Sequence, residues 1–321
     1  MNLNNRILND LLDKGLVTRD QYDRIDPIVS GKIISLWFEL RTLFYLGVLL
    51  FTTGVGILVY QNIGDLGHQL IIGLLIVITA ACFIYVFRAG PDYSNGVTPG
   101  PTPYFDYVVL LGSLLFISVQ GYLQFQYELL TENLGYSTLI TALFFFFVAY
   151  RFDHIGVLSL AITALASFWS ISLSPQKWYS GNFFTGSHLY TTAIIFGAAL
   201  AAVGLLLDWK KIKTHFTFTY LNFATLTFFA GAIAAMFLNE NYFLFVLLIF
   251  AGCAFSYYQA RQRRSFLLLL YAFLAGYIAL TYLLAETILS EPMIWFLYFI
   301  FSCGGFILFI IRYRKLFSRS E

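Results

Sequence analysis

The chain has 321 residues, of which 59% are hydrophobic and only 11% are charged, and its mean hydropathy is +0.76. A soluble globular domain carries about 25% charged residues, so this chain holds too little charge to cover a surface that faces water. The composition excludes a disordered chain, a coiled coil, collagen and a secreted disulfide scaffold. It predicts an all-α fold, a polytopic integral membrane helix bundle.

Residues 1–41 are predicted to form a short cytoplasmic and interfacial helical segment. Leucine and isoleucine recur at helical spacing before Gly15, and Thr18 with Gln21 forms a capping box for a second short helix that Pro27 ends. The segment has as many acidic as basic residues, which argues against nucleic-acid binding. We therefore expect it to dock on the bundle or on a protein partner. No cleavable signal peptide is expected, because the first apolar run begins only near Thr42.

Nine residues in the first 55 of the chain follow a recognisable pattern. They are Ile7, Leu11, Gly15, Gln21, Arg41, Leu46, Gly47, Gly54 and Val55. In this pattern the chain resembles the uncharacterised bacterial membrane-protein family known as domain of unknown function 2157. The resemblance implies a short helical segment followed by glycine-containing spans, and it implies no catalytic residues because the family has no assigned activity.

Ten apolar runs are long enough to cross the hydrocarbon core of a bilayer, which takes about 20 residues of helix. The predicted spans are 42–61, 69–87, 106–125, 135–150, 155–173, 188–207, 215–237, 242–259, 265–284 and 292–311. The sequence therefore predicts a bundle over residues 42–311, followed by a basic cytoplasmic tail over residues 312–321. The connection between spans four and five is only four residues long, 151–154.

The Lys and Arg residues alternate with the predicted spans. Of the 19 in the chain, all but Lys177 fall in the two terminal segments and in the connections after every second span. Because basic residues in short loops are retained in the cytoplasm, both termini are predicted to be cytoplasmic. We expect the protein to be integral to the membrane, in a bacterial inner (cytoplasmic) membrane. The connection 88–105 is rich in proline and glycine, and is predicted to be an extended, turn-rich loop.

Polar side chains line one face of the span 106–125. The candidates for a substrate path are Ser113, Gln120, Gln124 and Glu128, with Asn222 of the span 215–237 as a partner. Their spacings of seven and four place the first four on one helical face, where they would line a hydrated path. The alternative is that Gln120 and Gln124 hydrogen-bond neighbouring helices.

No sequence motif predicts a cofactor, a metal site or a nucleophile with its base, so catalysis is not expected. The leading hypothesis is a carrier or handler of an uncharged, amphipathic or lipid-like molecule, because a polar, uncharged path runs through a very aromatic bundle. The alternative is a non-transporting scaffold or sensor subunit that acts on a protein partner through its N-terminal helices.

Overall fold

The computed structural model describes residues 37–62, 68–127, 134–173 and 187–287, together with residues 18, 19, 22, 298, 300, 302, 304 and 305. All regular secondary structure in these residues is helical, which confirms the predicted all-α class. The chain divides into two compact units, Met1–Ile71 and Ile72–Glu321.

The first unit contains helix α3, Trp37–Asn62, whose apolar stretch Leu40–Ile57 is long enough to cross a membrane. The helix begins five residues before the predicted start of the first span at residue 42, since residues 37–41 are already part of it. Tyr22 donates its backbone N–H to the Thr18 carbonyl over 2.9 Å, one helical turn at the predicted second short helix. The rest of the predicted N-terminal helices lies outside the described residues.

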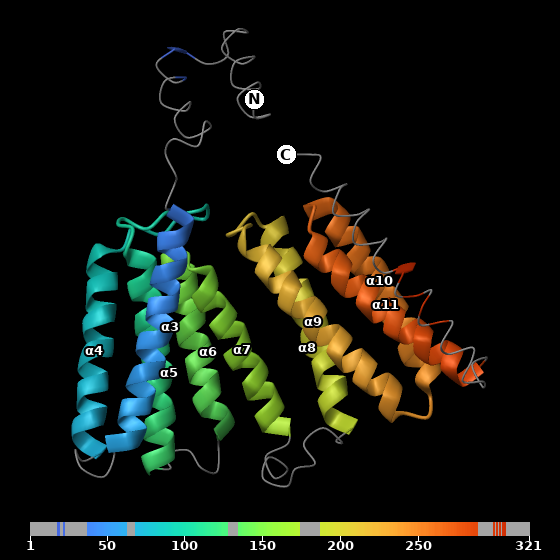
Figure 1. Cartoon of the computed structure of the whole chain (residues 1–321), viewed down its shortest axis with the longest axis horizontal. Coiled ribbons are helices and arrows are strands. Elements are labelled where there is room, and N and C mark those ends of the chain that lie inside the picture. Colours follow the sequence, from blue (N-terminus) through green and yellow to red (C-terminus); the bar gives the residue numbers. More distant parts are fainter. Residues whose placement is uncertain are drawn as a thin grey trace. The chain divides into compact units, whose positions relative to one another are not determined.

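The second unit begins within α4 and, in the residues that the structure describes, continues through seven further helices (Figure 1). Their bounds are α4 His68–Ala89, α5 Phe105–Tyr127, α6 Leu134–Phe152, α7 Ile155–Leu173, α8 Ser187–Trp209, α9 Phe216–Leu238, α10 Tyr242–Arg263 and α11 Phe266–Thr287. The predicted loop between α4 and α5 contains neither helix nor strand from residue 90 to residue 104.

The number of spans differs slightly from the predicted ten. Within the described residues, eight helices are long and apolar enough to cross a membrane, while α7 has a shorter apolar stretch, Ile155–Ile171. At 1.5 Å per residue, the 19 residues of α7 still extend about 28 Å, close to the thickness of a hydrocarbon core. Most of the predicted tenth span, 292–311, lies outside the described residues. Two residues from it, Tyr298 and Ser302, contact α11, where Tyr277 stacks on Tyr298 and shares a 3.0 Å hydrogen bond with Ser302.

The helices of the second unit pack most extensively in chain-adjacent pairs, α6 with α7, α8 with α9, and α10 with α11. Helix α9 is the most connected, since it also contacts α7, α10 and α11. Its mostly apolar sequence is accordingly buried along much of its length. Aromatic rings fill the contacts between α5 and α6, with Phe116 and Phe144 at a centroid distance of 4.6 Å.

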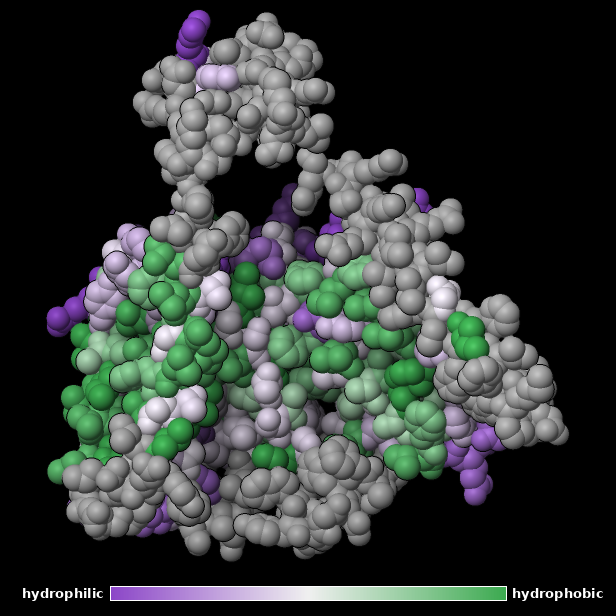
Figure 2. Space-filling model, viewed as in Figure 1, coloured by the Kyte–Doolittle hydropathy of each residue, from purple (hydrophilic) through white to green (hydrophobic). Residues whose placement is uncertain are grey.

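Large apolar side chains are exposed along the outer faces of these helices, among them Leu143, Ile195, Leu244 and Phe250. Figure 2 shows the same distribution: apolar residues dominate the middle of the visible face, and most of the strongly hydrophilic residues lie toward its margins. A surface this apolar is stable in lipid and not in water. The protein is therefore a membrane protein with several helices in the bilayer.

Four connections of the second unit lie at one end of its helices, 90–104, 153–154, 210–215 and 264–265. We call these connections and the adjoining helix ends the basic end, because they carry most of the Lys and Arg residues of the unit. Contacts between distant residues hold them together. The N–H of Lys213 donates to the Asn95 carbonyl over 2.9 Å, and Arg263 of α10 pairs with Asp208 of α8 over 2.6 Å.

Candidate functional site

Gln120 makes contacts that tie α5 to α6. Its side-chain N–H groups donate to the carbonyl and the hydroxyl oxygen of Ser137, each over 2.5 Å. Its carbonyl oxygen accepts a hydrogen bond from the Thr141 hydroxyl. Both the NH2 group and the carbonyl oxygen of the Gln120 amide therefore form hydrogen bonds between α5 and α6. Such bonds are the alternative role that the sequence analysis gave for Gln120.

Of the other predicted path residues that the structure describes, Ser113 and Gln124 lie on α5 and Asn222 lies on α9, and no hydrogen bond joins them to one another. Ser113 is fully buried and donates its hydroxyl to the Val109 carbonyl of its own helix, over 2.8 Å. Gln124 is half-buried one turn beyond Gln120. Asn222 lies on α9, where its carbonyl oxygen is buried without a hydrogen-bond partner in the described structure. Glu128 lies outside the described residues. The path through these residues stays a prediction.

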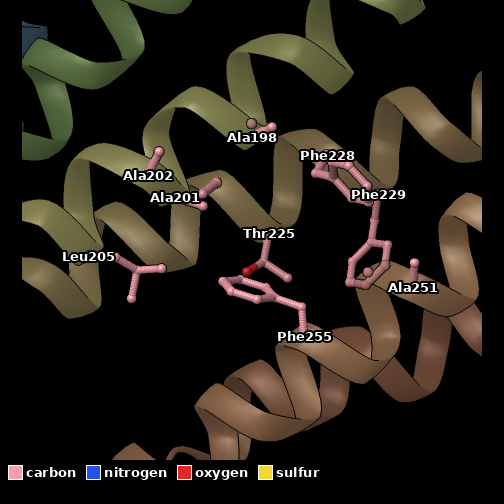
Figure 3. Close-up of a pocket in the computed structure, with 12 residues that line it drawn as sticks. Ala198, Ala201, Ala202, Leu205, Thr225, Phe228, Phe229, Ala251 and Phe255 are labelled. Atoms are coloured by element: carbon pink, nitrogen blue, oxygen red, sulfur yellow. The ribbon is translucent and has the colours of Figure 1, made fainter.

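A groove of about 390 Å³ opens between α8, α9 and α10 (Figure 3). Helices α8 and α10 contribute its walls and α9 its floor. The lining residues are Gly197, Ala198, Ala201, Ala202 and Leu205 of α8, Ala224, Thr225, Phe228 and Phe229 of α9, and Ala251, Gly252 and Phe255 of α10. Thr225 carries the only polar side chain among them, and its hydroxyl donates to the Leu221 carbonyl over 2.6 Å. The groove therefore offers an apolar surface with no charge.

Small and large residues together explain why this space is left open. A Cβ atom on Gly197 would lie 2.7 Å from the Phe228 backbone nitrogen and 2.8 Å from the Ala224 carbonyl oxygen, so α8 and α9 touch through their backbones. On the other side, a Cβ on Gly252 would lie 2.6 Å from the Phe228 ring. The ring of Phe228 separates α9 from α10, while the alanines of α8 are too short to reach across to α10. The groove is the gap that remains.

Charged and polar side chains bridge the two walls toward the basic end. Arg263 of α10 reaches Asp208 of α8, with a 2.6 Å contact between Nη2 and Oδ2. Its Nε donates to the buried Gln259 side chain over 3.3 Å. The bridge lies about one to two helical turns beyond Leu205 and Phe255, so the apolar groove ends where ionised groups begin.

A second charged contact at the basic end is almost completely buried. The carboxylate of Asp153 contacts Lys213 Nζ at 3.2 Å and His215 Nε2 at 2.5 Å, and accepts the Thr98 backbone N–H over 2.6 Å. The side chains of Asp153 and Lys213 are only 2% and 1% exposed. Lys213 also donates to the Gly96 carbonyl over 3.1 Å. The contact fastens the loop 90–104 to the α6–α7 and α8–α9 connections.

The sequence interpretation did not find the groove or the buried Asp153 contact. The signal for the groove was the run of small residues in α8 from Gly197 to Gly204, beside the Phe-rich α9 and α10. Lys213 was counted only as one of the basic residues that set the orientation.

Comparisons with other proteins agree with the membrane assignment. No curated protein and no solved structure matches the chain. A family model described as "Predicted membrane protein (DUF2157)" matches residues 9–158, from the N-terminal segment into the start of α7. The family resemblance found in the sequence motifs is thereby confirmed: this stretch of the chain matches the predicted membrane proteins of domain of unknown function 2157.

Proposed function

We propose that this protein binds a lipid-like molecule by a hydrocarbon chain, in the groove between α8, α9 and α10, and acts as a carrier or handler of that molecule. The observation that carries the proposal is the groove itself, an uncharged space of about 390 Å³ among helices that span a membrane. Binding pockets for small molecules have volumes of about 300–1,000 Å³, so the space suits a chain rather than an ion.

The lining supports an apolar occupant. The Thr225 hydroxyl is engaged with its own helix, and a polar ligand would have to give up hydrogen bonds to water without gaining new ones. Ala198, Ala202 and Ala251 are exposed at the edge of the groove, so a chain can enter sideways from the bilayer. Tyr298 and Ser302 contact Tyr277 of α11. Helix α11 contributes no residue to the lining of the groove, so these two contacts lie outside it.

The first experiment tests the groove with a lipid that carries a photoreactive group on its acyl chain. The protein is purified in lipid nanodiscs, irradiated and digested, and labelled peptides are identified by mass spectrometry. Peptides of α8 and α10 that contain Ala198 or Phe255 should be labelled above the level of other lipid-facing peptides.

Two neighbouring alanines of α8 provide a matched pair of variants. Ala198→Phe fills the groove, whereas Ala199→Phe adds the same bulk to an exposed position that does not line it. Labelling of the groove should fall severalfold in Ala198→Phe and stay unchanged in Ala199→Phe. Equal labelling in both variants would contradict the proposal, and a cross-linked dimer through these peptides would assign the groove to a second copy of the chain.

The orientation belongs to the same proposal. We propose that the basic end faces the cytoplasm of a bacterial inner membrane, as the distribution of Lys and Arg favours. A cysteine introduced by Ser94→Cys should then be shielded from a membrane-impermeant thiol reagent in whole cells, and one introduced by Glu240→Cys should react. Both positions are exposed in connections at opposite ends of the helices. The reverse labelling would overturn the orientation.

The polar path and the scaffold role make different predictions. If the polar stripe carries substrate, the combined change Gln120→Leu and Gln124→Leu should abolish transport in a folded protein. If the protein is a scaffold, that change should be silent, and removal of residues 1–27 should abolish its effect on a partner.

A further inference from the structure

An apolar groove in a membrane protein does not by itself select one lipid. The acyl chains of the bilayer are as apolar as the groove, so a chain that moves into it gains little from the hydrophobic effect. Selection must come from polar groups that meet the other end of the molecule. The residues beyond the groove toward the basic end therefore decide which lipid is held.

Four cations lie beyond this end of the groove, Lys210 and Lys211 after α8, and Arg261 and Arg264 at the end of α10. We call them the headgroup cations. All four side chains are exposed, and no ion pair holds any of them within the part of the chain that the structure describes. The only acidic residue in these two helix ends, Asp208, is already paired with Arg263.

Aromatic residues mark the depth of this region in the membrane. Trp209 is 78% exposed at the last position of α8, and Tyr258 is 63% exposed in the turn of α10 before Arg261. Exposed Trp and Tyr side chains concentrate at the boundary between hydrocarbon and headgroups. The headgroup cations follow directly after this boundary along both helices.

The axial spacing agrees with the shape of a phospholipid. Lys210 follows Leu205 by five residues and Arg261 follows Phe255 by six, which corresponds to about 8–9 Å along the helix axes. The headgroup layer on each side of a bilayer is about 5–8 Å thick. A lipid whose chain lies in the groove therefore has its phosphate within reach of the cations.

Two of the headgroup cations also occupy backbone positions that favour glycine. Lys211 and Arg264 adopt left-handed conformations, with φ of 57° and 52°. Glycine is the usual residue at such positions after a helix, and an unfavourable residue there points to a requirement for its side chain. Both positions carry a cation instead.

We propose that the groove binds an anionic phospholipid, with one acyl chain between α8 and α10 and the phosphate at Lys210, Lys211, Arg261 and Arg264. The inference rests on the proposed function, and it narrows the lipid-like molecule to one with a negatively charged headgroup.

The test compares two photoreactive lipids with identical acyl chains, a phosphatidylglycerol and a phosphatidylcholine, presented to the full-length protein in nanodiscs. The readout is the ratio of the two lipids on the groove peptides of α8 and α10. Because each basic residue near an anionic surface contributes about fivefold to binding, we expect phosphatidylglycerol to label these peptides more than fivefold over phosphatidylcholine.

Arg261→Gln and Arg88→Gln form a matched pair of variants. Both residues are exposed arginines in the last turn of a helix at the basic end, but Arg88 belongs to α4, which does not line the groove. Since one basic residue near an anionic surface contributes about fivefold to binding, Arg261→Gln should lower the ratio about fivefold and Arg88→Gln should leave it unchanged. Lys210→Gln is a second variant on the other wall, with the same expected loss.

The outcomes separate this inference from the proposed function. If both lipids label the groove equally, or if Arg88→Gln lowers the labelling ratio as much as Arg261→Gln, the inference of an anionic headgroup is overturned. The proposal that the groove binds a hydrocarbon chain would still stand. Absence of groove labelling by either lipid overturns the proposed function as well.

Discussion

The pairs α5–α6 and α8–α9 are both formed by neighbouring helices in the chain, but different residues hold them together. In α5–α6, large rings such as Phe116 and Phe144 fill the contact, and Gln120 adds hydrogen bonds to Ser137 and Thr141. In α8–α9, Gly197 lets the backbones touch. Large side chains fill the space between two helices. Small ones bring two helices into backbone contact, and a groove remains where the third helix, α10, does not reach the small residues of α8. Polar residues in a span are therefore a weaker guide to an open site than small residues beside large ones.

The largest effect should come from the buried charges that join the two regions at the basic end. Lys213→Met leaves the Asp153 carboxylate buried with only His215 and the Thr98 N–H as partners. Removing one partner of a buried ion pair costs about 3–5 kcal/mol. Thermal unfolding in detergent should show this loss, while Lys210→Met, at an exposed position, should change the midpoint little.

The next effect tests the backbone contact of α8 and α9. Gly197→Ala places a methyl group against the Phe228 nitrogen and the Ala224 carbonyl, and overpacking of this kind costs about 1–3 kcal/mol. Gly121→Ala on α5 is the control, because no atom lies within 4 Å of the added Cβ. It should stabilise the helix by about 0.5–1 kcal/mol. Similar results for both variants in an unfolding assay would remove the contrast between the two pairs.

A smaller effect is expected in α5–α6. Gln120→Leu removes hydrogen bonds to Ser137 and Thr141, and such bonds between membrane helices contribute about 0.6–2 kcal/mol. The combination with Thr141→Val should cost less than the sum of the single changes, because the two side chains share a bond. Strict additivity in the unfolding free energies would argue that Gln120 acts elsewhere.

The smallest effect has the opposite sign. Arg264→Gly relieves the left-handed conformation at the end of α10 and should stabilise the protein by about 0.5 kcal/mol, the difference between the conformational cost for arginine and the entropic cost of glycine. The same variant should lower the phosphatidylglycerol-to-phosphatidylcholine labelling ratio. Loss of both stability and ratio would mean that Arg264 is a structural residue.

Hydropathy and the placement of Lys and Arg were sufficient to predict the helical class and the nine described helices to within a few residues. The predicted connection 151–154 does separate two helices, although only residues 153 and 154 lie outside them, with Asp153 in a left-handed conformation. The groove was not predictable in this way, because it depends on which faces of α8 and α10 meet α9, and one apolar face looks like another in a hydropathy profile. The burial of Lys213 could not be predicted either, because its partners Asp153 and Gly96 are distant in sequence and contact it only in the folded protein.

The buried Asp153 contact also sets an order of events during synthesis. His215 follows Asp153 by 62 residues, and a ribosome adds about 5–20 residues per second, so the carboxylate waits about 3–12 s for its partners. During that interval α6 and α7 already exist, and the Thr98 N–H is the one partner of the Asp153 carboxylate described above that has already been synthesised. A nascent chain that stops before Lys213 therefore has the Asp153 carboxylate without the ammonium group that pairs with it in the complete protein. The loop 90–104 and the α8–α9 connection are joined by Lys213 only after it has been added, because its backbone N–H and its side chain donate to the Asn95 and Gly96 carbonyls.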